Sequence, residues 1–181
     1  MRDSKSATRH ILAPIITSIR PISKHLTQTR TVPRTIHLAI FSNGARPAHV
    51  AIFIPTGNTG PKGKVIHVTG NTAVGFFLEF KRNYDFSTEE RRYKTIPLDE
   101  VEDRYIVEVV GNGEPSSDTT ARDQLEAIAL IVPPPGRSPK PFDPSARNCQ
   151  DWMRDYVDKL VEEGIVGDAA RLVVESAPKV F

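Results

Sequence analysis

The spacing of hydrophobic and polar positions changes near residue 118, and the change predicts two kinds of structure. From residue 35 onward, short runs of β-branched and apolar residues are separated by turn residues, as is typical of strands. The expected strands are residues 35–41, 49–54, 64–69, 76–84, 93–98 and 105–110, with a turn or short helix over 98–104. The later spacing predicts helices over residues 119–131, 148–163 and 168–175. Strands followed by helices indicate an α+β fold, in which helices pack on an antiparallel sheet.

Two segments between the expected strands are rich in turn residues. Residues 42–47 contain Asn43-Gly44, a dipeptide favoured in tight hairpins. Residues 56–63 are glycine-rich and resemble a phosphate-binding P-loop, but no Ser or Thr follows Lys64. A strand is also expected where a P-loop requires a helix N-terminus. Both segments are therefore interpreted as hairpin loops.

A proline-rich segment, residues 132–141, separates the first two expected helices and contains the sequence PPPGRSPKP. One interpretation is a polyproline ligand for a partner domain. The favoured interpretation is a stiff connector that determines where the next helix begins.

Composition indicates an ordinary globular protein. The chain has 181 residues, enough for one domain, with 39% hydrophobic and 25% charged residues. A single cysteine excludes an internal disulfide and favours a reducing compartment, so we expect a cytoplasmic location. No apolar run approaches the length of a membrane span.

The net charge of +2 hides an uneven distribution. Residues 1–34 carry seven basic residues and one acid, which leaves 17 basic and 21 acidic residues in the remainder. We therefore expect a basic, flexible leader over 1–34 and a single α+β domain over 35–181. The leader also resembles a mitochondrial transit segment, so a mitochondrial location stays open. Because the remainder of the chain, residues 35–181, carries more acidic than basic residues, nucleic-acid binding is not expected.

The single cysteine, Cys149, lies at the start of the most strongly patterned helix. An apolar stripe at helical spacing comprises Cys149, Trp152, Met153, Tyr156, Val157, Leu160 and Val161. Asn148 is a good N-cap, and Asp151 adds an acid to the first turn. In this register the helix dipole is expected to lower the pKa of the thiol.

A second helix start remains open at Asp143-Pro144, an N-cap residue followed by proline. A helix beginning there places Cys149 in the second turn, where the dipole has little effect. The Asn148 start is favoured because the apolar stripe begins there. Since free cysteine is among the most buried residue types, Cys149 is either a packing residue or a nucleophile.

Two histidines are candidates for the base that a nucleophilic cysteine needs. His49 opens the strand HVAIFI and His67 lies near the end of the strand KVIHV, so pairing of these strands brings both imidazoles onto one sheet. The second helix must then cover the face that carries His49 for the thiol to reach its imidazole. No close-spaced ligand pair predicts a metal site, and no cofactor is expected. The remaining histidines, His10, His25 and His37, have no supporting pattern, although His37 lies on the first strand.

Three short stretches together carry a resemblance to a known family. HVAIF at His49, VIHV at His67 and NCQDW at Cys149 occur in that order. They resemble the circularly permuted papain-like cysteine hydrolases and acyltransferases, notably the lecithin:retinol acyltransferase-like group and the PPPDE-like peptidases. The resemblance implies a permuted papain-like fold, with Cys149 as nucleophile, His49 as base and His67 as the residue that orients the imidazole. Gln150-Asp151 stands where the former group commonly has Glu-His.

The resemblance implies a thioester intermediate and an acyl, amide or peptide substrate. Transfer to water makes an amidase, peptidase or isopeptidase, and transfer to an amine or alcohol makes an acyltransferase; the sequence does not separate them. A non-catalytic papain-like module that binds a protein partner is the alternative. A basic cluster is interpreted as a solvated face rather than a site for acidic substrates, because acids are interleaved with it. It consists of Lys81, Arg82, Arg91, Arg92 and Lys94.

Overall fold

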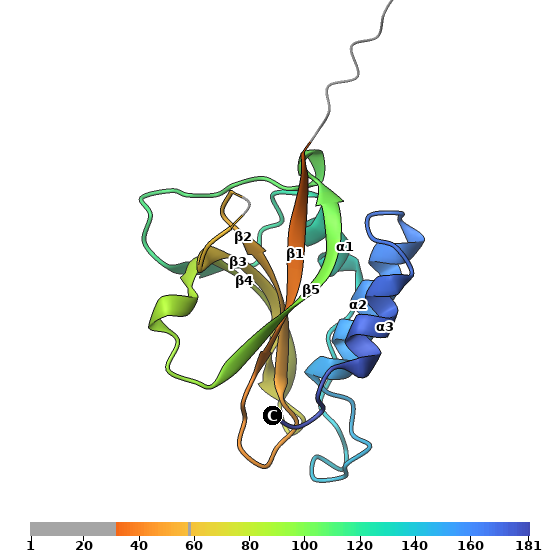
Figure 1. The fold of residues 1–181 in the computed structure, drawn as a ribbon. Helices are drawn as coiled ribbons and strands as arrows, with labels where there is room; N and C mark the ends of the chain where they lie inside the picture. Colours follow the sequence, from red (N-terminus) through yellow and green to blue (C-terminus); the bar gives the residue numbers. More distant parts are fainter. Residues whose placement is uncertain (1–31, 58) are drawn as a thin grey trace, which may run out of the picture. The chain divides into compact units, whose positions relative to one another are not determined.

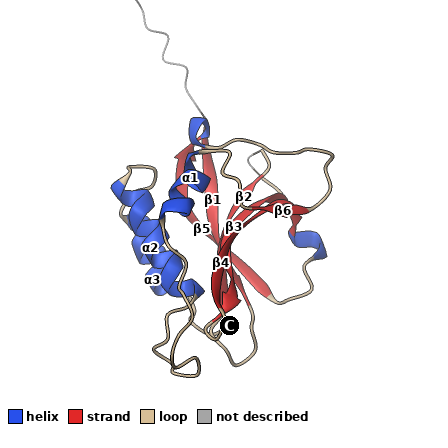
Figure 2. Cartoon of the chain, turned by 180° about the vertical axis from the view of Figure 1, so that it is seen from behind, coloured by secondary structure: helices blue, strands red, loops and turns tan. Residues whose placement is uncertain are grey.

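The computed structural model describes residues 32–57 and 59–181, so the expected leader lies outside the described residues except for its last three positions. An antiparallel six-stranded sheet has the strand order β5-β1-β2-β3-β4-β6; Figure 1 labels the first five of these strands and Figure 2 also labels β6. The strands are β1 (Pro33–Phe41), β2 (His49–Pro55), β3 (Lys62–Asn71), β4 (Gly75–Asp85), β5 (Tyr93–Glu102) and β6 (Ser116–Asp118). The helices are α1 (Gln124–Ile131), α2 (Cys149–Glu162) and α3 (Ala169–Ser176), with short 3-10 turns η1 (Phe86–Thr88) and η2 (Asp103–Tyr105). The predicted α+β class, with an antiparallel sheet and α-helices after the strands, is confirmed.

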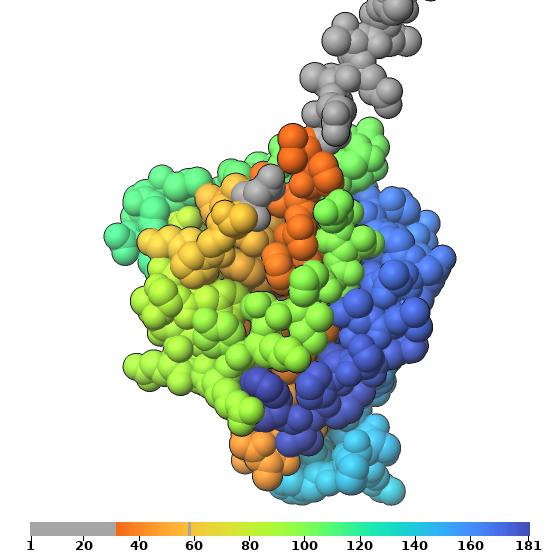
Figure 3. Space-filling model, in the orientation of Figure 1, coloured from red at the N-terminus to blue at the C-terminus, as the bar shows by residue number. Residues whose placement is uncertain are grey.

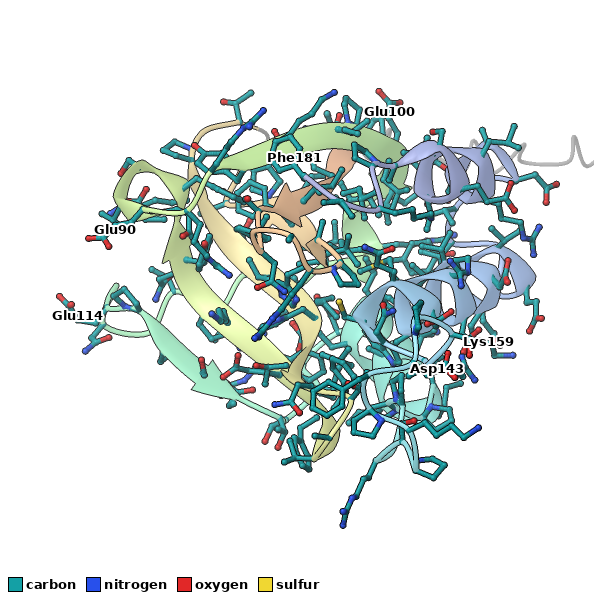
Figure 4. The ribbon with its side chains drawn as sticks, turned by 90° about the horizontal axis from the view of Figure 1, so that it is seen from below. Glu90, Glu100, Glu114, Asp143, Lys159 and Phe181 are labelled. Atoms are coloured by element: carbon teal, nitrogen blue, oxygen red, sulfur yellow. The ribbon has the colours of Figure 1, made fainter. Side chains whose placement is uncertain are left out.

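The three helices lie on one side of the sheet (Figures 1 and 2). Alternate strand residues divide between two apolar clusters, as the period of two along a strand requires. Val50, Ile52 and Ile66 belong to the large cluster that contains the buried stripe of α2. Ala51 and Phe53 belong to a smaller cluster on the opposite face. In Figure 4, Lys159 on α2 and Glu90 lie on opposite sides of the sheet.

The opposite face is covered by aromatic side chains instead of helices. Phe86 of η1 stacks on Phe41 with ring centroids 5.7 Å apart, and it meets Phe53 edge-on at 4.7 Å. Tyr84 and Tyr93 pack around the same ring, at 5.1 and 4.5 Å. Such aromatic pairs stabilise a fold beyond the area that they bury. The sheet is therefore packed on both faces around its central strands.

Helix α2 begins where the apolar stripe begins. The Asn148 side chain accepts a hydrogen bond from the Gln150 N–H at 2.8 Å, and the Asp151 carboxylate accepts one from the Asn148 N–H at 2.7 Å. This capping box satisfies backbone donors at the helix start. The predicted start at Asn148 is confirmed, and Asp143 caps only a turn, in which its carboxylate accepts from the Ser145 N–H.

Two buried aromatic residues join α2 to the preceding segment. The indole N–H of Trp152 donates to the Val132 carbonyl at 3.1 Å, and the Tyr156 hydroxyl donates to the Leu125 carbonyl at 2.8 Å. Both side chains are fully buried. Burying a large side chain stabilises the folded state by about 2–3 kcal/mol. The burial of these two side chains, together with their hydrogen bonds, holds α2 against α1 and the sheet.

The proline-rich segment runs in extended form along the turn between β3 and β4. Its Pro135 carbonyl accepts from the Phe76 N–H at 2.8 Å, and its Ser138 N–H donates to the Thr72 carbonyl at 2.8 Å. The Thr72 hydroxyl also donates to the Pro141 carbonyl at 2.7 Å. These bonds agree with the interpretation as a connector that leads into α2.

The strand expected over residues 105–110 is wrong. Ile106 of that segment joins the core and Tyr105 packs against it, whereas Val107 and Val110 are exposed. The Val107 N–H donates to the Asp123 carboxylate, and the Val110 carbonyl accepts from the Asn83 side chain. Side chains thus satisfy backbone groups that a strand would pair, and β6, which the pattern did not indicate, occupies the edge beside β4 instead.

A buried ionic network holds α1 against β3 and β4. Glu126 of α1 is fully buried; its carboxylate accepts from Lys64 at 3.0 Å and from Arg82 at 3.1 Å. Arg82 also donates to Asp118 of β6 at 2.8 Å. Asp123 caps α1 by accepting from the Glu126 N–H, which explains why the helix begins at Gln124, later than the pattern predicts.

No helix in the described ranges is long and apolar enough to cross a membrane.

Candidate functional site

Two imidazoles and a carboxylate form a hydrogen-bonded chain on the sheet face opposite the helices. Nε2 of His49 on β2 lies 2.9 Å from Nδ1 of His67 on β3. Nε2 of His67 lies 2.8 Å from the Glu79 carboxylate on β4. His67 is directly opposite Glu79 in the ladder, so their side chains share a face. The sheet thus brings together both predicted histidines and adds Glu79, which the sequence analysis did not identify.

The carboxylate determines the tautomers along this chain. An ionised Glu79 only accepts hydrogen bonds, so Nε2 of His67 carries the proton and its Nδ1 is an acceptor. Nε2 of His49 must then donate to His67, which leaves Nδ1 of His49 with a free lone pair. No hydrogen bond to that Nδ1 occurs within residues 32–57 and 59–181. His49 is therefore arranged as a neutral base.

Both imidazoles are held in the neutral form at neutral pH. Burial lowers the pKa of His49 to about 3, and the nearby charges of His67, Arg91 and Lys81 act in the same direction. Burial also lowers the pKa of His67 to about 4, although the hydrogen bond that His67 donates to Glu79 opposes it. A neutral imidazole is able to accept a proton, but a pKa as low as that of His49 makes it a weak base at neutral pH.

Cys149 is the first residue of α2 and lies at the edge of β2. Its Sγ is 3.8 Å from the Ala48 carbonyl oxygen, and the Val50 N–H lies near enough to lower the pKa of the thiol. These groups belong to the residues immediately before and after His49. The thiol is therefore beside the backbone of the residue predicted to be its base.

A local separation of β2 from β3 makes room for the thiol. The β2–β3 ladder runs from Pro55–Gly63 only as far as Ile52–Ile66, whereas β2 continues to pair with β1 as far as His49. The thiol bonds to the strand edge that β3 no longer covers. On the other face, the imidazoles of His49 and His67 bridge the same gap.

The condition for direct contact between thiol and imidazole is not met. That contact required α2 to cover the sheet face that carries His49, but the apolar stripe of α2 packs on the face of Val50 and Ile52. His49 contacts Phe41 on the other face, with ring centroids 5.7 Å apart. Thiol and imidazole therefore approach the gap from opposite faces, and no hydrogen bond joins them in the part of the chain that the structure describes.

The predicted effect on the thiol pKa is also wrong. Burial raises the pKa of Cys149 above its ordinary value, since only 6% of the residue is exposed. The backbone N–H groups of Val50, Cys149 and Gln150 lower the pKa, as a helix start does, but burial outweighs them. The thiol is therefore protonated at neutral pH and needs a base before it can act as a nucleophile.

The last residues of the chain cover the start of β2. The Lys179 carbonyl accepts from the Ala48 N–H and from the Gln150 side-chain amide, each at 2.9 Å. The Arg92 guanidinium lies 4.7 Å from the centroid of the Phe181 ring, and Figure 3 shows this C-terminal segment in dark blue against the green surface. The C-terminal segment therefore holds Ala48 and Gln150, the chain neighbours of His49 and Cys149.

The basic cluster separates into different environments. Arg82 is buried in the ionic network with Glu126, which corrects its interpretation as part of a solvated face. Lys81 and Arg91 lie near the imidazole pair and lower the pKa of both histidines. Arg92 and Lys94 are exposed, as a solvated face predicts.

Among the described residues, there is no group of three or more His, Cys, Asp or Glu side chains that could hold a metal ion. The hydrogen bonds of both imidazoles lead to each other and to Glu79 instead. His37 lies on the same sheet face. The centroid of its ring is 6.3 Å from that of Phe53, and His37 takes no part in the hydrogen-bonded chain of His49, His67 and Glu79.

A family model matches residues 36–167, the segment from β1 to just beyond α2. The family is described as one of unknown function, DUF6540, and the match covers most of the chain, so the chain belongs to this family. Neither the curated proteins nor the solved structures contain a significant match.

Proposed function

We propose that this member of the DUF6540 family is a cysteine-dependent acyl hydrolase or acyltransferase that acts through a thioester on Cys149. The observation that carries the proposal is the position of the thiol beside the backbone of His49, whose imidazole is oriented by His67 and Glu79. A nucleophile, a base and a group that orients the base are the parts that thiol catalysis needs. A permuted papain-like fold belongs to the same proposal, supported by a base on β2 that precedes the nucleophile in the chain.

The proposed reaction starts from a neutral thiol and a neutral imidazole. Nδ1 of His49 is bonded to Cγ, so it is the ring nitrogen nearer the strand backbone that the sulfur contacts. Thiol and imidazole lie on opposite faces of the sheet, so the proposed step requires them to meet through the gap between β2 and β3. Nδ1 then accepts the thiol proton as sulfur attacks the acyl carbon, and the new imidazolium is stabilised through His67 by Glu79. The imidazolium then protonates the leaving amine or alcohol, and the acyl group stays on sulfur as a thioester.

Charge on the acyl oxygen would be stabilised at the start of α2. The Cys149 N–H is one of the first helical N–H groups, which have no partner within the helix. Such a group is a suitable oxyanion donor because the helix dipole adds positive potential there. Water then hydrolyses the thioester, or an amine or alcohol acceptor takes the acyl group. No step calls for a metal or an organic cofactor.

A cytoplasmic location is part of the proposal, because the nucleophile is a free thiol that an oxidising compartment would modify.

A second candidate function is a non-catalytic papain-like module that binds a protein. The low exposure of Cys149, and the approach of thiol and imidazole from opposite faces, favour this candidate. Under it, Cys149 packs against β2 and the histidine chain stabilises the sheet.

Trapping of the thioester separates the two candidates. The protein is mixed with a panel of p-nitrophenyl esters and analysed by intact mass spectrometry after acid quench. The proposed enzyme function predicts that the protein gains the mass of one acyl group and that hydroxylamine removes this group. The mass gain should be absent in Cys149→Ala and smaller in His49→Gln. The control variant His37→Gln, changed on the same sheet face, should show the same mass gain as the wild-type protein. A gain that persists in Cys149→Ala, or none with any ester, supports the binding module.

A further inference from the structure

Four charged side chains surround the imidazole pair on the sheet face opposite the helices. Lys81, Arg91 and Glu89 act on the charge of His49, and Glu79 acts on His67. The two positive and two negative formal charges sum to zero. What this surface can bind therefore depends on which of the four charged groups is not already paired with another group.

Three of the four charges are already paired. The Glu79 carboxylate bonds Nε2 of His67 at 2.8 Å. Glu89 bonds the Arg91 guanidinium at 2.9 and 2.7 Å and accepts from the Tyr84 hydroxyl. The Arg91 guanidinium also lies over the Phe41 ring at 4.5 Å, which holds it in place. These groups form a fixed surround for the imidazoles.

Lys81 is the exception. It lies opposite Val65 in the β3–β4 ladder, two residues along β4 from Glu79, so its side chain shares the face of the imidazoles. Its Nζ lies 5.6 Å from the centroid of the Tyr84 ring, and within the described ranges it has no carboxylate partner. The half-buried ammonium is therefore a free positive charge next to the candidate base.

We propose that Lys81 determines substrate specificity by binding a carboxylate of the acyl substrate on the imidazole side of the gap between β2 and β3, so that the enzyme prefers acidic peptides or acidic acyl donors. This inference rests on the proposed function. A substrate carboxylate satisfies the free ammonium, and the neighbouring Glu79 and Glu89 do not compete because each is engaged elsewhere. A basic substrate group would meet Lys81 and Arg91 without a free carboxylate to bind.

The test compares three fluorogenic amides that differ only next to the scissile bond: acetyl-glutamyl, acetyl-glutaminyl and acetyl-lysyl 7-amido-4-methylcoumarin. Each is assayed with the full chain and with Lys81→Gln and Lys81→Glu, whose melting temperatures confirm folding. Lys94→Glu is the matched control, because Lys94 is exposed and lies opposite Ile40, which belongs to the cluster on the helix side of the sheet.

The glutamyl amide is expected to show a kcat/KM roughly tenfold above the glutaminyl amide, a preference typical of one charge contact. Lys81→Gln should abolish the preference and Lys81→Glu should reverse it in favour of the lysyl amide, whereas Lys94→Glu should change neither. Cys149-dependent turnover without a charge preference, or with a preference that survives both Lys81 changes, overturns this inference and leaves the proposed function intact. Absence of Cys149-dependent acylation by the p-nitrophenyl esters and of turnover of all three amides overturns both.

Discussion

Nε2 of His49 lies 2.9 Å from Nδ1 of His67, although the two residues are on strands that no longer pair at that point. The side-chain bond replaces ladder hydrogen bonds across the gap, and the thiol of Cys149 bonds the backbone on the same edge of β2. The site therefore coincides with an interruption of the sheet. Its parts depend on the register of three strands and on the start of one helix.

The helix cap is expected to matter for both stability and reactivity. Asn148→Ala removes a side-chain acceptor from the start of α2 and should lower the free energy of unfolding by about 1 kcal/mol. The Cys149 thiol should also be alkylated more slowly in this variant, because the N–H groups that lower its pKa become less ordered. Urea denaturation and iodoacetamide kinetics measure the two effects. Asn148→Asp, which keeps a capping oxygen, should restore both, and equal losses in the two variants would contradict the assignment.

The buried ionic network predicts a large stability effect far from the site. Glu126→Gln removes the buried carboxylate that Lys64 and Arg82 share, so that Lys64 keeps only Asp123 and Arg82 only Asp118, and should cost about 3 kcal/mol. Urea denaturation checks this, with Glu162→Gln on the exposed face of α2 as control. The control pairs only with Lys159 at the surface and should change stability by less than about 0.5 kcal/mol. Similar losses in both variants would show that Glu126 is not desolvated.

The imidazole pair predicts loss of stability on acidification. Because the pKa values of His49 and His67 in the folded protein lie near 3 and 4, below the unfolded value of 6.5, the unfolded state binds more protons between these limits. The stabilising contribution is complete above pH 6.5 and is lost progressively as the pH falls toward the folded values. Denaturation between pH 7 and 4.5 should show a falling free energy of unfolding, above the range in which most carboxylates titrate.

His49→Gln provides the control for this pH effect, since glutamine can still donate to His67 but does not titrate. Its unfolding free energy should depend less steeply on pH over the same range, while His37→Gln should keep more of the slope. Equal slopes in the wild-type protein and His49→Gln would contradict the lowered pKa of His49.

The cover over the start of β2 should limit access to the thiol. Gln150→Ala removes side-chain hydrogen bonds to the carbonyls of Ala48 and Lys179, each at 2.9 Å, and should cost about 1–2 kcal/mol. The Ala48 amide, which donates to Lys179, should then exchange with deuterium faster. Unchanged exchange in Gln150→Ala would mean that the C-terminal segment is held by other contacts.

The strands around the site were predicted well because alternation and turn residues are features of short stretches of sequence. Strand alternation is sufficient to place His49 on the face of Phe53 and His67 on the face of Val65, which is their arrangement in the structure. Glu79 was also within reach of the sequence. A hairpin centred on residue 73 pairs Asn71 with Gly75, and counting back along the ladder pairs His67 with Glu79.

Other features depend on long-range contacts that no local pattern carries. Which face α2 covers is decided by its packing against Val50 and Ile52, so alternation alone could not assign it. The thiol pKa depends on burial by segments far away in the chain, and this burial reverses the effect of the helix start. The place of β6 beside β4 is set by the pairing of Asp118 with Arg82 across 36 residues, which a short polar stretch does not reveal.

The most direct test of the account is the rate at which iodoacetamide modifies Cys149 at pH 7 in the folded protein. If His49 is the base for this thiol, His49→Gln should slow the modification by about 10²-fold, the usual contribution of general-base catalysis. His37→Gln should leave the rate unchanged. Equal rates in the wild-type protein, His49→Gln and His37→Gln would contradict the account, because the thiol and the imidazole would then act independently.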